Sequence, residues 1–164
     1  IEMKNLKLFF WAVFIQVFIL NNIQLSGYIN PYYYVIFIFT LPSKNSQTQT
    51  LLLSFLIGFL IDLFSYSYGV HAFASVLVGY LKILWVKKAN SLKDSEEEFE
   101  IKNLSINQFL TFSFYLVFIH HFTLFALDQF NFNQFFAIVK VTLTSTMFTV
   151  LLLLIHKLFS IQKT

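Results

Sequence analysis

The stretch "GFLIDLFSYSYGVHAFAS", residues Gly58–Ser75, places one carboxylate, Asp62, at the end of an apolar run and follows it with a polar turn and a second apolar run. Whether a carboxylate is tolerated there depends on whether water or lipid surrounds the chain. An aspartate at the centre of a bilayer costs about 2.5–3.5 kcal/mol, and this cost falls toward the interface. The stretch therefore fits a hairpin of two membrane-spanning helices with Asp62 near its tip.

The composition indicates lipid as the solvent. The 164 residues are 57% hydrophobic and only 12% charged, whereas soluble domains carry about 25% charged residues. A single domain of this length cannot hide so much apolar surface from water. The sequence has no cysteine, which excludes disulfides and thiolate metal sites. The lysines lie in loops rather than on one basic patch, so we expect no nucleic-acid partner.

Apolar segments divide the chain into one compact all-α bundle, a polytopic membrane protein of six transmembrane helices. A helix needs about 20 residues to cross the hydrocarbon core, and these segments are solidly apolar rather than alternating as in a β-barrel. A polar cytoplasmic loop is expected over residues 87–107. The predicted spans are 6–22, 29–41, 48–64, 69–86, 108–127 and 135–155.

Lysines set the predicted orientation. They precede the first span, follow the second, fourth and sixth, and are missing from the connections 21–28, 65–68 and 128–134. With six spans these lysines all fall on one side, which the positive-inside rule makes the cytoplasm, together with both termini. A re-entrant hairpin for the third and fourth spans would keep the same parity and is not excluded by charge.

The Asp62 hairpin carries the clearest candidate site. Gly58 lies one turn before Asp62 on the same helix face, where it lets another helix approach closely. Gly69 can supply a positive φ in the turn, and His71 can hydrogen-bond Asp62 across the hairpin. We expect a structural role for Asp62, through His71 or through the backbone, rather than a catalytic one. Ser75 and Gly79 add a small-xxx-small packing face.

Polar residues of the last two spans have structural interpretations. Lys140 is expected to snorkel to the headgroups, and the alternative is an ion pair with Asp62 or Asp128. His120 and His121 point in different directions on one helix, so we interpret them as packing or interfacial residues. Four hydroxyls form a stripe that we expect to bond across helices or to carbonyls of the same helix: Thr142, Ser145, Thr146 and Thr149.

The sequence lacks the motifs of common enzymes. It contains no phosphate-binding glycine loop, no HExxH, no nucleophile elbow and no dinucleotide fingerprint. Asp62 also lacks a second carboxylate for acid–base chemistry on its side of the membrane, apart from Asp128 in a loop. We therefore expect no catalytic residues, no metal site and no cofactor.

The first half of the chain resembles a known family. The matching elements, in order, are "NN" at Asn21–Asn22, "GYINPY" at Gly27–Tyr32, "LP" at Leu41–Pro42, "G...D.F" at Gly58–Phe64 and "GVHAFAS" at Gly69–Ser75. Their order and spacing are similar to MreD, the rod shape-determining membrane proteins of bacteria. The second half agrees in hydropathy and span count.

The resemblance implies a non-enzymatic subunit of the cell-elongation machinery in the bacterial inner (cytoplasmic) membrane. Members of the family bind MreC, a single-span protein, and with it link MreB filaments to the synthases of lateral peptidoglycan. Their fold is similar to that of the substrate-binding subunits of energy-coupling-factor transporters. Gly58, Asp62, Gly69 and His71 match the family motif, and we interpret them as fixing the outer end of a hairpin where a partner docks. We also consider a homodimer.

Two other functions stay open. A vitamin-type transport subunit would dock its coupling component through a small-xxx-small pattern on the first span. Here the span reads "LKLFFWAVFIQVFIL", and Ala12 is its only small residue, which counts against transport. An unrelated lipid-binding membrane protein is the third hypothesis.

Overall fold

The computed structural model describes residues 3–23, 29–91, 100–129 and 134–161. Within these ranges the regular elements are all helices. They are α1 (Met3–Phe14), which continues as η1 (Ile15–Ile19) and η2 (Leu20–Asn22), then α2 (Val35–Thr40), α3 (Gln47–Ser65), α4 (Val70–Ser91), η3 (Ile101–Asn103), α5 (Ile106–Gln129) and α6 (Phe135–Ile161). The prediction of an all-α chain is confirmed for this part.

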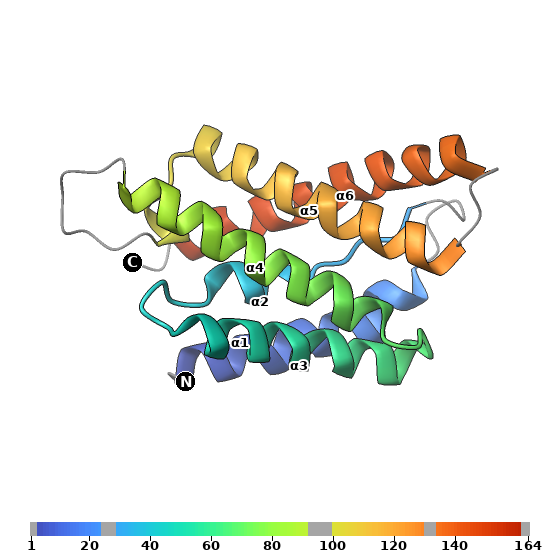
Figure 1. The fold of residues 1–164 in the computed structure, drawn as a ribbon, viewed down its shortest axis with the longest axis horizontal. Helices are drawn as coiled ribbons and strands as arrows, with labels where there is room; N and C mark the ends of the chain where they lie inside the picture. Colours follow the sequence, from blue (N-terminus) through green and yellow to red (C-terminus); the bar gives the residue numbers. More distant parts are fainter. Residues whose placement is uncertain (1–2, 24–28, 92–99, 130–133, 162–164) are drawn as a thin grey trace.

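The helices run along one axis and form a bundle (Figure 1). The contacts are most extensive between α3 and α4, between α5 and α6, and between α4 and α5, whereas α2 packs against α1, α3 and α4. Helices α2 and α4 thus lie between the α1–α3 side and the α5–α6 side. The start of α1 and the end of α6 lie at the same end of the bundle in Figure 1, which we call the inner end; the α3–α4 turn marks the outer end.

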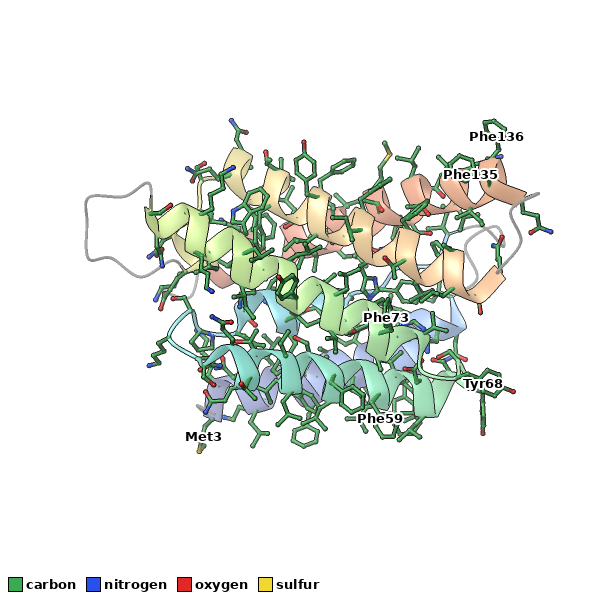
Figure 2. All side chains as sticks on the ribbon, viewed as in Figure 1. Met3, Phe59, Tyr68, Phe73, Phe135 and Phe136 are labelled. Carbon is green, nitrogen blue, oxygen red and sulfur yellow. The ribbon has the colours of Figure 1, made fainter. Side chains whose placement is uncertain are left out.

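Apolar side chains cover the outside of the bundle (Figure 2). Phe136 is 87% exposed and Phe10 is 62% exposed, while Gln16, Ser54 and Thr149 are fully buried. The core is still mostly apolar, but large apolar side chains also cover the surface, which suits contact with lipid rather than with water. Five helices are long and apolar enough to span a membrane: Met3–Asn22, α3, α4, α5 and the Phe135–Phe159 part of α6.

The second predicted span is where the sequence prediction was wrong. Instead of a helix over 29–41, the structure has the six-residue helix α2, preceded by a non-helical segment through Asn30 and Pro31. Residues 36–39 of α2 are at most 1% exposed, so the segment forms the core of the bundle. An apolar run of this length fits a buried core helix as well as a membrane span, and hydropathy alone does not separate the two.

Non-helical backbone inside a bundle needs hydrogen-bond partners, and Gln16 supplies two of them. Its Nε2 donates to the carbonyl of Pro31 at 3.0 Å, and its Oε1 accepts from the backbone N–H of Tyr34 at 3.4 Å. Gln16 lies in the π-helical turn η1, a type of helical irregularity that often accompanies functional sites. The first helix thereby holds the second segment in place.

Helix α6 supplies the other partners of this segment. Ser145 Oγ accepts from the backbone N–H of Asn30 at 3.0 Å, and Thr149 Oγ1 accepts from that of Tyr32 at 3.1 Å. Irregular backbone at membrane depth persists only where protein or water satisfies its polar groups. Two members of the predicted hydroxyl stripe thus bond to a segment more than a hundred residues away in the chain.

The remaining helices are longer than predicted. Helix α4 continues to Ser91, so part of the expected loop is helical. Reciprocal capping boxes open two helices: Ser46 with Gln49 begins α3, and Ser105 with Gln108 begins α5. The part of the predicted loop from 92 to 99 lies outside the described residues, as does Gly27.

Candidate functional site

Asp62 fixes the outer end of the α3–α4 hairpin. Its Oδ1 accepts from the backbone N–H of His71 at 3.0 Å and from Ser67 Oγ at 2.5 Å, and its Oδ2 accepts from the backbone N–H of Ala72 at 2.8 Å. The carboxylate therefore caps the start of α4, where N–H groups lack helical partners and a negative charge is favoured. Of the two predicted structural roles for Asp62, the backbone role is the one observed.

The turn after Asp62 has three residues in left-handed conformation. Tyr66 (φ 56°), Tyr68 (φ 52°) and Gly69 (φ 92°) all have positive φ. This is costly for a tyrosine, yet both side chains are exposed, Tyr66 at 85% and Tyr68 fully, and Figure 2 shows Tyr68 projecting from the turn. The hairpin tip thus holds a strained backbone conformation and exposes two aromatic side chains at the outer end.

Two glycines let α3 and α4 touch. A Cβ placed on Gly58 would lie 2.5 Å from the carbonyl oxygen of His71 and 2.7 Å from Ala72 Cα, and one on Gly79 would collide with Ser54 Oγ. Helix–helix contact through small residues is the expected mode in membranes. The Gly58 and Ser75–Gly79 faces are therefore used inside the chain, and this surface is not free for a partner.

The side chain of His71 points away from Asp62 into a buried polar cluster. Its Nδ1 lies 3.1 Å from Tyr34 Oη, which is also 2.7 Å from His120 Nε2 and 3.4 Å from Ser75 Oγ. The predicted side-chain contact between His71 and Asp62 is replaced by the backbone contact. A phenolic hydroxyl donates one proton, so one of the two histidines accepts that proton and the other donates to the oxygen.

His121 belongs to a second branch of the same cluster. Its Nδ1 lies 2.9 Å from the carbonyl oxygen of Val117, which can only accept, so Nδ1 carries a proton. In the neutral ring Nε2 then accepts from Thr149 Oγ1 at 3.2 Å. Both His120 and His121 are fully buried. The interfacial interpretation is therefore wrong, and the packing interpretation omitted their hydrogen bonds.

Several buried polar atoms near this cluster have no protein partner. Within the described residues these include His120 Nδ1, Ser113 Oγ, Thr142 Oγ1 and Thr146 Oγ1. Such atoms in a protein interior are commonly satisfied by bound water. No group of three or more His, Asp or Glu side chains in the described part of the chain could hold a metal ion.

A cavity of about 440 Å³ opens at the outer end above the cluster. Its wall comes from η1, η2, the α3–α4 hairpin, α5 and the 30–32 segment, and includes Asn21, Asn30, His71 and Asp128. Asn21 Oδ1 also accepts from Gln16 Nε2 at 2.8 Å. The cavity wall thus brings together Asn21 and His71, which lie far apart in the sequence and both belong to the elements of the family resemblance.

Two buried lysines hold the inner end. Lys82 Nζ donates to the carbonyls of Ile38, at 3.0 Å, and Leu41, while Lys157 Nζ donates to those of Ile101, at 3.3 Å, and Leu104. Both side chains are at most 4% exposed. Each ammonium group thus caps carbonyls where a short helical segment ends.

Lys140 does not appear among the described contacts of Asp62. The carboxylate already accepts three hydrogen bonds from the α4 cap, and this arrangement satisfies its charge without a lysine. The ion pair of Lys140 with Asp62 stays a prediction.

Sequence reasoning missed three residues that organise the site. Gln16, Tyr34 and Lys82 were not among the predicted site residues. Two of them had a detectable signal: Gln16 is the only amide side chain between Leu8 and Leu20, and Lys82 continues the spacing of His71, Ser75 and Gly79 along α4. The partners of all three come from segments distant in sequence.

The fold and site together indicate a class of protein: an all-α membrane protein with several helices able to span a bilayer. No family model, curated protein or solved structure matches the chain.

Proposed function

We propose that the chain is an MreD-type scaffold of the bacterial cytoplasmic membrane. In this proposal the chain crosses the membrane six times, five times as a long helix and once through the buried segment 29–41, with both termini in the cytoplasm. It binds an MreC-type single-span protein and helps couple MreB filaments to lateral peptidoglycan synthesis. The proposed fold relationship to the substrate-binding subunits of energy-coupling-factor transporters belongs to the same proposal. Its basis is the order of sequence elements from Asn21 to Ser75.

The observation that carries a scaffold function is the hairpin tip. Asp62 and Gly58 hold the tip rigidly, and the left-handed backbone at 66–69 presents Tyr66 and Tyr68 outward. Tyrosine is enriched at the energetic centres of protein interfaces because it buries a large rigid area at low entropic cost. A preformed tip also avoids the ordering cost of a flexible loop on binding.

The lysines agree with the proposed orientation. The inner end of the bundle carries Lys4, Lys7 and Lys44, along with Lys87 and Lys88 at the end of α4 (Figure 1). The positive-inside rule assigns this end to the cytoplasm. The hairpin tip then faces the periplasmic side, where the larger part of an MreC-type partner would lie.

Co-purification of MreC from cells that express tagged variants tests the proposal. Tyr66→Ser with Tyr68→Ser should lower MreC recovery about tenfold, as expected for two interface tyrosines, without changing the abundance of the chain. Tyr80→Ser, at another exposed tyrosine on α4, is the matched control and should leave recovery unchanged. Equal losses in both variants would contradict docking at the tip.

The outer cavity favours a second candidate, a vitamin-type substrate-binding transport subunit. Its volume of about 440 Å³ lies in the range of small-molecule sites, and its wall is rich in amide and hydroxyl groups. Depletion of the chain separates the two functions. Loss of rod shape supports the scaffold, and unchanged shape with lost vitamin uptake supports transport.

A further inference from the structure

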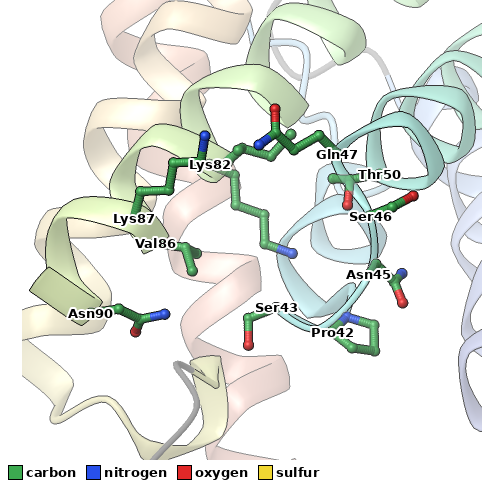
Figure 3. A pocket seen from close by; sticks show the side chains of 11 residues that line it. Pro42, Ser43, Asn45, Ser46, Gln47, Thr50, Lys82, Val86, Lys87 and Asn90 are labelled. Carbon is green, nitrogen blue, oxygen red and sulfur yellow. The ribbon is translucent and has the colours of Figure 1, made fainter.

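A second cavity, of about 310 Å³, lies at the inner end between the start of α3 and the last turns of α4. Figure 3 shows the Lys82 side chain running from α4 toward the connection that carries Pro42 and Ser43, with Lys87 and Asn90 further along the same helix. The described lining contains two lysines and no acidic residue. The cavity is therefore electropositive.

The charge of Lys82 lacks an acidic partner within the described residues. The side chain is 3% exposed, and its ammonium group donates to two carbonyls. An ammonium group has three N–H donors, so a third donor is left for a ligand in the cavity. A buried cation with only neutral partners is costly, and an anion in the cavity would offset that cost.

Two further features of the wall fit an anion. Ser43 Oγ is buried without a protein partner. The first turn of α3, from Gln47, also borders the cavity. Its capping box uses the N–H groups of Ser46 and Gln49, and the positive end of the helix dipole still favours a negatively charged ligand. Hydroxyl, ammonium and helix N–H donors together make the donor set of a phosphate site.

We propose that this cavity binds a phosphate-bearing headgroup, that of an anionic phospholipid of the cytoplasmic leaflet. Its position at the inner end, beside the exposed Lys87, places it at headgroup level in the proposed orientation. Anionic headgroups are bound there by basic pockets between transmembrane helices. The site is at the opposite end of the bundle from the hairpin tip, so a failure of lipid binding and a failure of partner docking can be told apart.

Lipid binding by the purified full chain tests the site. Native mass spectrometry should show phosphatidylglycerol, titrated into detergent micelles, binding more tightly than phosphatidylcholine. Lys87→Gln should weaken phosphatidylglycerol binding about tenfold, whereas Lys88→Gln, the adjacent exposed lysine outside the cavity wall, should weaken it less than about twofold. Ser43→Ala provides a second variant that keeps every charge, and it should also weaken binding.

The outcomes separate the sources of phosphate. If inorganic phosphate at millimolar concentration displaces the lipid, the site takes free phosphate rather than a headgroup. Equal weakening by Lys87→Gln and Lys88→Gln, or equal binding of both lipids, would show only non-specific attraction and overturn the proposal. Unfolding midpoints of each variant distinguish lost binding from lost structure.

Discussion

Buried charged side chains bind backbone groups of the helix connections at both ends of the bundle, and the charges at the two ends are opposite. At the outer end one carboxylate, Asp62, accepts from the free N–H groups at the start of α4. At the inner end two ammonium groups, of Lys82 and Lys157, donate to carbonyls at the ends of α2 and η3. Helix starts need acceptors and helix ends need donors. Buried charges thus secure the helix connections at both ends of the described bundle. Substitutions at Asp62 and Lys82 test this directly, and those at Gly58 and Tyr66 test the packing and the backbone of the outer end.

Gly58→Ala should have the largest effect. The added Cβ would overlap the backbone of His71 and Ala72, and backbone atoms cannot rotate away, so the α3–α4 hairpin must open. We expect a loss of about 3 kcal/mol in unfolding free energy, at the upper end of overpacking costs. Thermal unfolding followed by tryptophan fluorescence in detergent measures it.

Gly79→Ala is the matched control in the inner half of the same helix pair. There the new methyl group meets the Ser54 hydroxyl, which can change rotamer. A loss as large as that of Gly58→Ala would contradict the assignment of the tight contact to the outer half.

Asp62→Ala should rank second. It leaves two backbone N–H groups and Ser67 Oγ without their acceptor, and loss of a helix cap costs up to about 2 kcal/mol. Asp62→Asn keeps one acceptor oxygen and should lose about half as much. If both variants keep the wild-type unfolding midpoint, the cap does not stabilise the hairpin.

Lys82→Met should cost less, about 1 kcal/mol. The substitution removes two hydrogen bonds to carbonyls but also removes a charge that is expensive to bury, and the two effects partly cancel. Methionine fills similar space with little strain. Unfolding in the same detergent gives the value, and a loss larger than that of Asp62→Ala would reverse the ranking of the two ends.

Tyr66→Gly should have the smallest effect on stability and the opposite sign. Glycine adopts φ 56° without the steric cost that tyrosine bears, and the exposed ring makes little packing contribution. We expect a gain of up to about 1 kcal/mol together with weaker MreC recovery. A stabilised variant that still binds the partner fully would separate Tyr66 from the proposed interface.

The sequence was sufficient for the features that depend on local pattern. Apolar length predicted the five long helices, and the Asp62 hairpin with Gly58 was located from residue spacing. The second segment could not be predicted, because its partners Gln16, Ser145 and Thr149 come from the first and last helices. The Tyr34–His71–His120 cluster was missed for the same reason: helix spacing does not show which helices meet.

The non-helical stretch at Asn30–Tyr32 also sets an order of assembly. Its amide groups receive their acceptors from Ser145 and Thr149, which are synthesised more than a hundred residues later. Until α6 has been inserted, this stretch is expected to stay hydrated or held by other components of the insertion machinery. Helix α6 therefore completes the middle of the molecule long after that segment has been synthesised, and shortening the chain before α6 should leave a species prone to degradation.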